Sequence, residues 1–367
     1  MTERYRAPFR PDGSHPIDDA FASRLLAEAL SRGGDYADLF FEYSAGGSVA
    51  LEDGVIKTAS RGVSLGLGVR VQSGDATGYA YCESLDEPAM IEAARTAARI
   101  AAGGAREARP LGAPVVGTSR YHAQVSTLEL AGEAKVALLR RADAAARAYD
   151  PRVAKVTASF TEALREVLIF TSEGDVVRDR QPMIRFGVNA IAEADGKRQG
   201  GSSGGGGRVG LEYFMSAGRR PEDHAREAAR IAITNLDARE APAGELPVVL
   251  AAGDSGILLH EAVGHGLEAD FNRKKTSRYS DQVGEKVASS LVTVIDDPTY
   301  AGSRGSIHVD DEGRPAQPLQ LIEGGVLRGY MHDRLSARHF KTASGNGRRE
   351  SFREPPMPRM TNTMMLG

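Results

Sequence analysis

Residues Leu246 to Asp270, LPVVLAAGDSGILLHEAVGHGLEAD, form the stretch around which the rest of the chain is organised. Leu246 to Ala251 is a short apolar run of strand length, and Gly253 to Gly256 is turn material. A helical pattern begins at Ile257. The stretch therefore predicts a buried strand, a turn and a helix.

The predicted helix carries His260, Glu261 and His265 in its first turns. Two imidazoles offer nitrogen ligands suited to zinc, and a carboxylate next to the first can take a proton from a water bound to the metal. The structural alternative is a pair of histidines hydrogen-bonded in a helical core beside an exposed glutamate. The residue types thus indicate a metal centre without requiring one.

The spacing of the two histidines is unusual. In the common zinc-protease motif they are four residues apart, whereas HEAVGH separates them by five. At ~100° per residue, five steps leave the side chains roughly 140° apart on an ideal α-helix, too far for one ion. A π-bulge, or a helix break at Gly264, would bring them together by adding a residue to one turn. We predict one of these distortions.

Length and composition limit what the rest of the chain can be. With 367 residues, it is too long for one ordinary core, and a net charge of −3 gives no drive toward nucleic acid or acidic membranes. Cys82 is the single cysteine, so an internal disulfide framework is excluded. The amino terminus has no apolar signal region, and no run approaches the ~18 apolar residues of a membrane span. We expect a cytoplasmic protein.

The remaining pattern predicts an α+β fold with mainly antiparallel sheets, flanking helices and three consecutive domains. Asp53-Gly54 separates two β-prone runs, a strong hairpin signal, and a second hairpin follows with its turn at SGDA. A Pro- and Gly-rich linker, Arg109 to Thr118, comes after a helix. The predicted units are an N-terminal domain over 1–119, a central domain over 120–240, and a C-terminal domain over 241–367.

Two stretches of biased composition leave alternatives open. Gly200 to Gly207 is either a flexible loop or a backbone surface that lines a cleft, and on the second interpretation Gly204, Gly205, Gly206 and Gly207 are candidate substrate-binding residues. Arg334 to Arg359 carries seven Lys or Arg against two Glu. This segment is either a solvated loop or a cationic wall for substrate carbonyls or a terminal carboxylate, with Arg348 and Arg349 as candidates.

Several motifs resemble the TldD/PmbA metallopeptidases, and the resemblance is to the zinc-bearing TldD side of that family. The run GILLHEAVGHGLEADFNRKKTSRYSDQVGEKVAS looks like its metal-binding signature. SVALEDGVIKTASRGVSLGLGVRV with TGYAY resembles its first domain, RQGGSSGGGGRVG its central domain, and RRESFREPPMPRMTNTMMLG part of its third. The resemblance covers nearly the whole chain, and the helix motif is its specific part.

The resemblance implies a function for the histidine pair. His260 and His265 would be zinc ligands, and Glu261 would be the general base of a peptidase acting on unstructured peptides or partly unfolded proteins. It also implies pairing with a paralogous metal-free subunit, or self-pairing into a homodimer. The alternative is a non-catalytic peptide-binding or assembly subunit. A nucleic-acid role has no motif or charge to support it.

The sequence departs from the family at the third zinc ligand. Family members take this ligand from a cysteine beyond the PRMTNT region, and no such cysteine precedes Gly367. We therefore expect a truncated chain with an incomplete last domain, weak zinc binding and poor peptidase activity. Cys82 is interpreted as a small, partly buried hydrophobe. Possible substitute ligands, each more simply a surface or structural group, are Glu268, Asp270, His308, His332 and His339.

Overall fold

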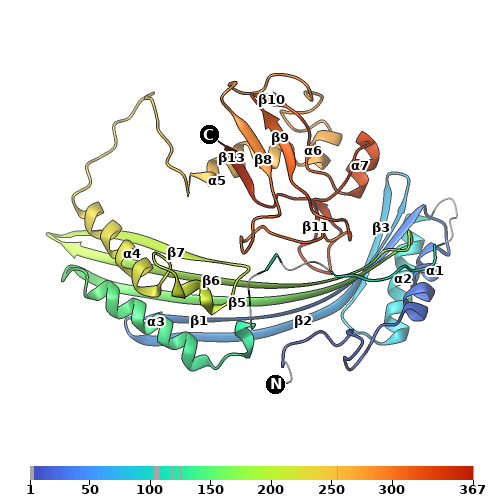
Figure 1. Ribbon diagram of the computed structural model, residues 1–367, viewed down its shortest axis with the longest axis horizontal. Coiled ribbons are helices and arrows are strands. Elements are labelled where there is room, and N and C mark those ends of the chain that lie inside the picture. Colours follow the sequence, from blue (N-terminus) through green and yellow to red (C-terminus); the bar gives the residue numbers. More distant parts are fainter. Residues whose placement is uncertain are drawn as a thin grey trace.

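The fold combines one large curved sheet with a smaller unit that stands on its concave side (Figure 1). The computed structural model describes residues 4–102, 108–116, 120–121, 123, 126–253 and 255–366. The large sheet holds seven strands and is antiparallel except for one short strand, and the smaller unit is built on a four-stranded antiparallel sheet. The predicted α+β class is therefore confirmed.

The large sheet has the strand order β3-β2-β1-β5-β6, and both β4 and β7 pair with β6. Its strands are β1 (Tyr36–Glu52), β2 (Val55–Ser73), β3 (Ala76–Cys82), β4 (Val115–Val116), β5 (Val153–Thr171), β6 (Val176–Ala194) and β7 (Lys197–Gly207). The predicted N-terminal and central units meet where β1 pairs with β5 over the whole length of β1 from Asp38. The two units therefore share one continuous sheet.

Short turn signals in the sequence set the hairpins. Asp53 and Gly54 both have positive φ, 49° and 77°, as a tight two-residue hairpin turn requires, and they join β1 to β2 as predicted. The second predicted hairpin, β2 to β3, also forms. The strands are long, and β5 alone has 19 residues.

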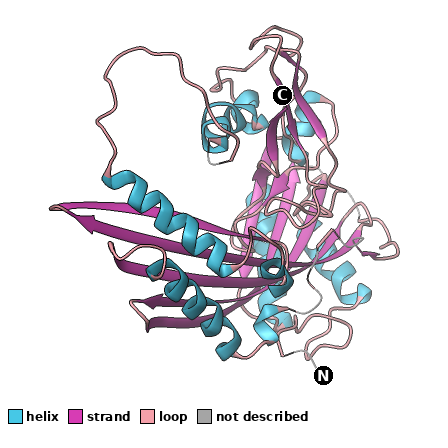
Figure 2. Ribbon diagram, turned by 60° about the vertical axis from the view of Figure 1, so that its left-hand side comes forward, coloured by secondary structure: helices cyan, strands magenta, loops and turns pink. Residues whose placement is uncertain are grey.

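Four helices cover the convex face of the large sheet (Figures 1 and 2). Odd-numbered residues of β1 and even-numbered residues of β5 point to this face, where they form two apolar cores. The helices are α1 (Asp19–Leu30), α2 (Glu87–Ala101), α3 (Gly132–Arg147) and α4 (Pro221–Leu236). Short 3-10 turns lie at η1 (Thr127–Glu129) and η2 (Leu211–Met215). The concave face remains for the C-terminal unit.

The C-terminal unit has the strand order β10-β9-β8-β13 beside a two-stranded pair, β11-β12. Phe40, Val167 and Ile169 on the concave face of the large sheet pack against its Val309 and Phe352. The strands of the unit are β8 (Thr293–Asp296), β9 (Leu319–Glu323), β10 (Val326–Leu327), β11 (Gly347–Arg348), β12 (Met357–Pro358) and β13 (Thr363–Leu366), and its helical segments are α5 (Gly256–Leu259), η3 (His260–Gly264), η4 (His265–Leu267), α6 (Ala269–Arg273) and α7 (Arg334–Phe340).

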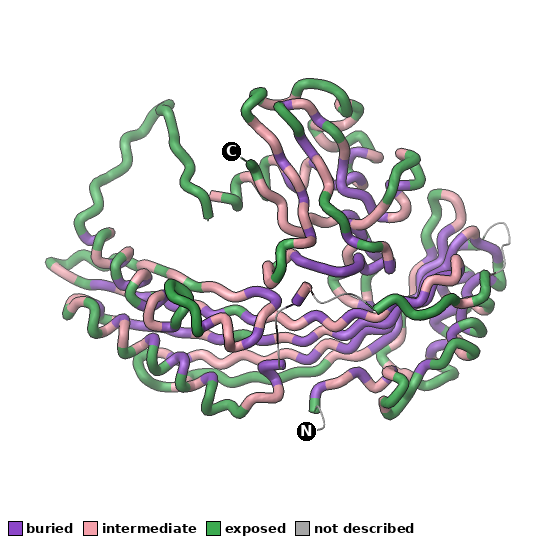
Figure 3. The backbone as a smooth tube through the Cα atoms, in the orientation of Figure 1, coloured by how far each residue is buried: buried purple, intermediate pink, exposed green. Residues whose placement is uncertain are grey.

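Two local predictions were wrong, and one of two alternatives for a third stretch is excluded. Leu246–Ala251 is an exposed connection between α4 and α5 rather than a buried strand (Figure 3). Its Val249 is 96% exposed. No described segment offers this run a neighbouring strand, and a strand needs a partner for its backbone groups. Gly200–Gly207 lies in β7, which excludes the flexible loop and leaves the alternative of a surface that lines a cleft. Part of the predicted linker forms β4, while Gly117 and Thr118 lie outside the described residues.

Within the described ranges, no helix has the length and apolar character needed to cross a bilayer. The long helices α3 and α4 have 16 residues each, against the ~20 of a typical span.

Candidate metal centre

The histidine pair lies on a distorted helix. α5 leads into the π-helical turn η3, and the backbone N–H of His265 donates to the carbonyl oxygen of His260, five residues earlier. A 3-10 turn, η4, follows directly. The extra residue in this turn is the π distortion that the five-residue spacing predicts, so that prediction is confirmed.

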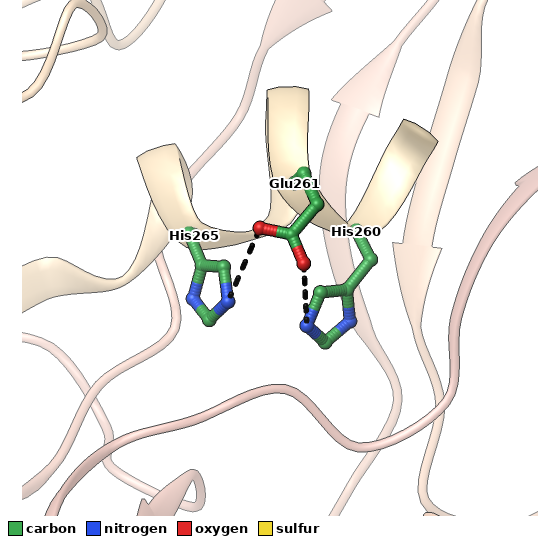
Figure 4. A group of neighbouring side chains, drawn as sticks. All are labelled: His260, Glu261 and His265. Carbon is green, nitrogen blue, oxygen red and sulfur yellow. Dashed lines mark ion pairs between the residues drawn. The ribbon is translucent and has the colours of Figure 1, made fainter. Parts of the chain in front are cut away.

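The π turn brings the two imidazoles together around the carboxylate of Glu261. The centroids of the His260 and His265 rings are 4.7 Å apart. Each Nε2 atom lies 4.0 Å from a different oxygen of Glu261 (Figure 4). All three side chains are 40–65% exposed, so a ligand can reach them.

The donor atoms suit a zinc ion. The ligand atoms of the three residues lie within 4.8 Å of one another, and in the described part of the chain they form one such group. Zinc–nitrogen bonds of ~2.0–2.1 Å require two bound imidazole nitrogens to lie within about 4.2 Å of each other. Small side-chain rotations on an exposed turn can bring the two imidazole nitrogens within this distance.

Glycines allow the turn to pack closely. A Cβ atom on Gly264 would lie 2.1 Å from the sulfur of Met360, which packs against the π turn. A Cβ atom on Gly266 would lie 2.7 Å from the ring of Tyr279. Both contacts are shorter than any real Cβ contact, so these positions require glycine or a shift of their neighbours.

Glu268 contacts the far side of the His265 ring. Its Oε2 lies 3.2 Å from His265 Nδ1 and 2.8 Å from Nη1 of Arg359. The side chain is fully buried, and burial raises the pKa of this carboxyl group, with His265 and Arg359 acting in the opposite direction. Glu268 lies behind the His265 ring, because its carboxylate faces Nδ1, whereas Nε2 faces Glu261. Of the two roles that the sequence left open, this contact favours the structural one over a third ligand at the same ion.

The other candidate third ligands do not join the group. Within the described residues the cluster contains His260, Glu261 and His265 and no further ligand. Cys82 lies on β3, where burial raises the pKa of its thiol to about 11, so the thiolate that binds metals is disfavoured. Those that remain outside the cluster are Asp270, His308, His332 and His339.

The glycine run borders a separate groove. Gly204, Gly205, Gly206 and Gly207 line a cavity of about 520 Å³ together with Arg185, Asn189 and Arg304. The side chains on one side of β7 must be small, because a Cβ on Gly201 would lie 2.2 Å from the backbone of α4. The groove opens on the concave face of the large sheet, and Figures 1 and 2 place α5 on this same side of the sheet.

Most arginines of the predicted cationic wall are committed to ion pairs. The Arg349 guanidinium is fully buried and lies 2.5 Å from Asp38 of β1, which also binds Arg70 of β2. Arg348 lies 3.6 Å from Asp311. Arg349 therefore fastens the C-terminal unit to the large sheet, and its side chain is closed to a substrate. A substrate contact by Arg348 stays a prediction.

Comparisons with known proteins agree with this site. Three family models match the chain: PmbA/TldA metallopeptidase domain 1 over residues 37–101, the central domain over 127–236 and the C-terminal domain over 243–367. The chain is 45% identical over 340 residues to the metalloprotease TldD homolog of Haemophilus influenzae, covering 90% of this chain and 70% of that protein. The chain belongs to the PmbA/TldD metallopeptidase family.

Two further relatives show the range of the family. A zinc metalloprotease TldD homolog of Saccharolobus solfataricus is 33% identical over 135 residues, covering 36% of this chain and 30% of that protein. The crystal structure of TldE from Thermococcus kodakarensis matches the fold with a TM-score of 0.77 at 19% identity, covering 94% of this chain and 77% of that chain. At this identity the structural likeness supports the fold alone.

Proposed function

We propose that this chain is a zinc-dependent peptidase in which His260 and His265 bind the metal and Glu261 acts as the general base. The observation that carries the proposal is the π turn, which gathers both imidazoles around one carboxylate. The chain's relatives are named metalloproteases, one of them a zinc metalloprotease. Imidazole nitrogens are suitable zinc ligands, and zinc is the ion most often held by such sets in peptidases.

The roles of the side chains follow from their positions. When bound, zinc lowers the pKa of water and polarises a peptide carbonyl. Glu261 lies between the two Nε2 atoms, so its carboxylate can accept the proton of the attacking water and pass it to the leaving amine. The exposure of the three side chains leaves space for an extended peptide. Two imidazoles are fewer than the three protein ligands of most catalytic zinc sites, so we expect weak zinc binding.

The substrate side of the proposal rests on β7. This strand pairs with β6 along one edge, and among the described residues no strand pairs with its other edge. An extended peptide can add to such an edge through main-chain hydrogen bonds, which give affinity with little side-chain selectivity. Gly204 to Gly207 and the groove beside them would then contact unstructured peptides or partly unfolded proteins.

We also propose that this chain works as one of two paired subunits. This pairing is with a paralogous metal-free subunit or with a second copy of this chain, as the resemblance of its motifs to the TldD/PmbA family implies. A cytoplasmic location is proposed on the sequence, since the single cysteine, Cys82, cannot form an internal disulfide.

Cleavage of a disordered peptide tests the catalytic role. The wild-type chain, Glu261→Gln and a control, Glu285→Gln at an exposed glutamate of the same unit, are compared during a zinc titration. We expect Glu261→Gln to lower kcat/KM by about 10²–10⁴ and the control to change it little. Equal activity of Glu261→Gln and wild type would overturn the general-base role. Absence of zinc-dependent cleavage by the wild type would favour a non-catalytic peptide-binding subunit.

A further inference from the structure

Glu268 occupies a special position behind the metal-binding face of His265. It follows η4 directly, and the backbone is held by one hydrogen bond on each side of it. The Met331 N–H donates to the oxygen of Leu267, and the Ala269 N–H donates to the oxygen of Met331. Its side chain is fully buried and reaches both His265 Nδ1 and Arg359. A half-exposed imidazole is thus backed by a fixed, buried carboxylate.

This contact selects one tautomer of His265. A carboxylate at 3.2 Å accepts a hydrogen bond, so the neutral ring carries its proton on Nδ1. The lone pair then remains on Nε2, the nitrogen that faces Glu261. A histidine prepared in this way needs no change of tautomer before it binds a cation.

Arg359 fixes the carboxylate in turn. Its Nη1 donates to the same Oε2 atom at 2.8 Å, while the other oxygen, Oε1, is buried without a hydrogen-bond partner. Burying a carboxylate is costly unless it is paired, so the contacts with Arg359 and His265 keep Glu268 in place. Arg359 itself is anchored by hydrogen bonds between its backbone and Asn346.

We propose that Glu268 is a positioning residue, held by Arg359, which orients His265 and fixes its Nδ1–H tautomer for a divalent metal. The inference rests on the proposed function, because it assigns His265 Nε2 to the metal. Carboxylates that accept a hydrogen bond from a ligating histidine are a recurrent outer-sphere arrangement, and their loss weakens metal binding about 10–100-fold. Glu268 does not touch the metal or the substrate in this scheme.

The competing explanation is that Glu268 and Arg359 form a structural ion pair that joins α6 to β12. Asn272 provides a matched control, because its buried side chain bonds the backbone oxygens of Gly266 and Glu268 without touching an imidazole. Asn272→Ala loosens the same turn and leaves the carboxylate in place. A structural role predicts similar effects of the Asn272 and Glu268 variants, and a positioning role predicts a difference.

Two measurements on the full chain separate these explanations. Ring ¹⁵N chemical shifts of His265 in the metal-free protein, assigned with His265→Gln, report its tautomer above the imidazole pKa. We expect Nδ1–H in wild type and in Asn272→Ala, and a shift toward Nε2–H in Glu268→Gln and Glu268→Ala. An Nε2–H tautomer in the wild type, or an unchanged tautomer in both Glu268 variants, would overturn the proposal.

Zinc affinity, measured by competition with a chromophoric chelator, gives the second readout. Glu268→Gln should raise the zinc Kd about 10–100-fold, and Asn272→Ala by less than about threefold. Equal affinities of wild type and Glu268→Gln, with binding still lost in His265→Ala, would refute the positioning role and leave the metal site standing. If His265→Ala binds zinc as well as wild type, the proposed metal site fails instead.

Discussion

Replacement of Gly264 by alanine is the most direct test of the π turn. The added Cβ would lie 2.1 Å from the sulfur of Met360, with its Cε at 3.0 Å and its Cγ at 3.4 Å. Ordinary contact begins near 3.4 Å, so the sulfur and the turn must separate by about 1.3 Å. The three nearest atoms all belong to the Met360 side chain, so a rotation of the terminal methyl alone is not enough, and either the whole side chain or the turn must move.

The expected loss of zinc affinity follows from how precisely the ligands of a metal site must be placed. Overpacking of this kind destabilises a protein by about 1–3 kcal/mol. Ligand geometry must be kept within ~0.5 Å for a working site, so the imidazoles are misplaced when the turn takes more than about 0.5 Å of this 1.3 Å displacement. We expect Gly264→Ala to lose zinc affinity by more than its loss of fold stability alone would explain.

The assay compares wild type, Gly264→Ala, Met360→Ala and the double variant. Zinc affinity is measured by chelator competition, and the free energy of unfolding by urea titration of the metal-free chains. Truncation of Met360 removes the clashing atoms, so the double variant should regain zinc affinity relative to Gly264→Ala. Unchanged zinc affinity in Gly264→Ala, or no recovery in the double variant, would refute the packing argument.

Three further outcomes are expected. Burial lowers the pKa of His332 to about 4. On acidification the imidazole therefore binds a proton at a higher pH in the unfolded chain than in the folded one. Lowering the pH from about 7 to about 5 should then cost about 2 kcal/mol of unfolding free energy. His332→Gln should remove that part of the slope in urea titrations, and an unchanged slope would contradict the assignment. Arg349→Met leaves the buried Asp38 without one partner and should lower the unfolding free energy by about 3–5 kcal/mol, whereas no change would show that the pair is not needed to fasten the units. Gly201→Ala meets the backbone of α4 at Ala228, so it should lower the midpoint of thermal unfolding with zinc affinity unchanged, and an unaltered midpoint would count against the close approach.

The distortion of the helix was predicted correctly because its information is local. The five-residue spacing of His260 and His265 demands a distorted helix if both bind one ion, and the structure has a π turn at these residues. For Glu268 the sequence left a ligand role and a structural role open. Its distance along the chain from His265 is compatible with a ligand on the same helix face, but the 3-10 turn η4 redirects it behind the ring.

The run LPVVL, which does not form a strand, shows the opposite limit. Its composition is that of a buried strand, yet a strand exists only through hydrogen bonds to a neighbour, and the described segments provide none. Gly200 to Gly207 shows the reverse case. This run has a composition typical of loops, yet it forms β7, where α4 leaves no space for a larger side chain at Gly201. In both stretches the packing partner decided the outcome.

The sequence by itself determined the turns and the distorted helix, because positive-φ glycines and the spacing of ligands act over a few residues. It also determined the family, through motifs distributed over nearly the whole chain. Only the tertiary structure decided which charges are buried and what stands behind each ligand. Arg359 lies 91 residues after Glu268, and no local pattern connects the two. Such a contact forms only when sheet pairing and core packing have brought the distant segments together.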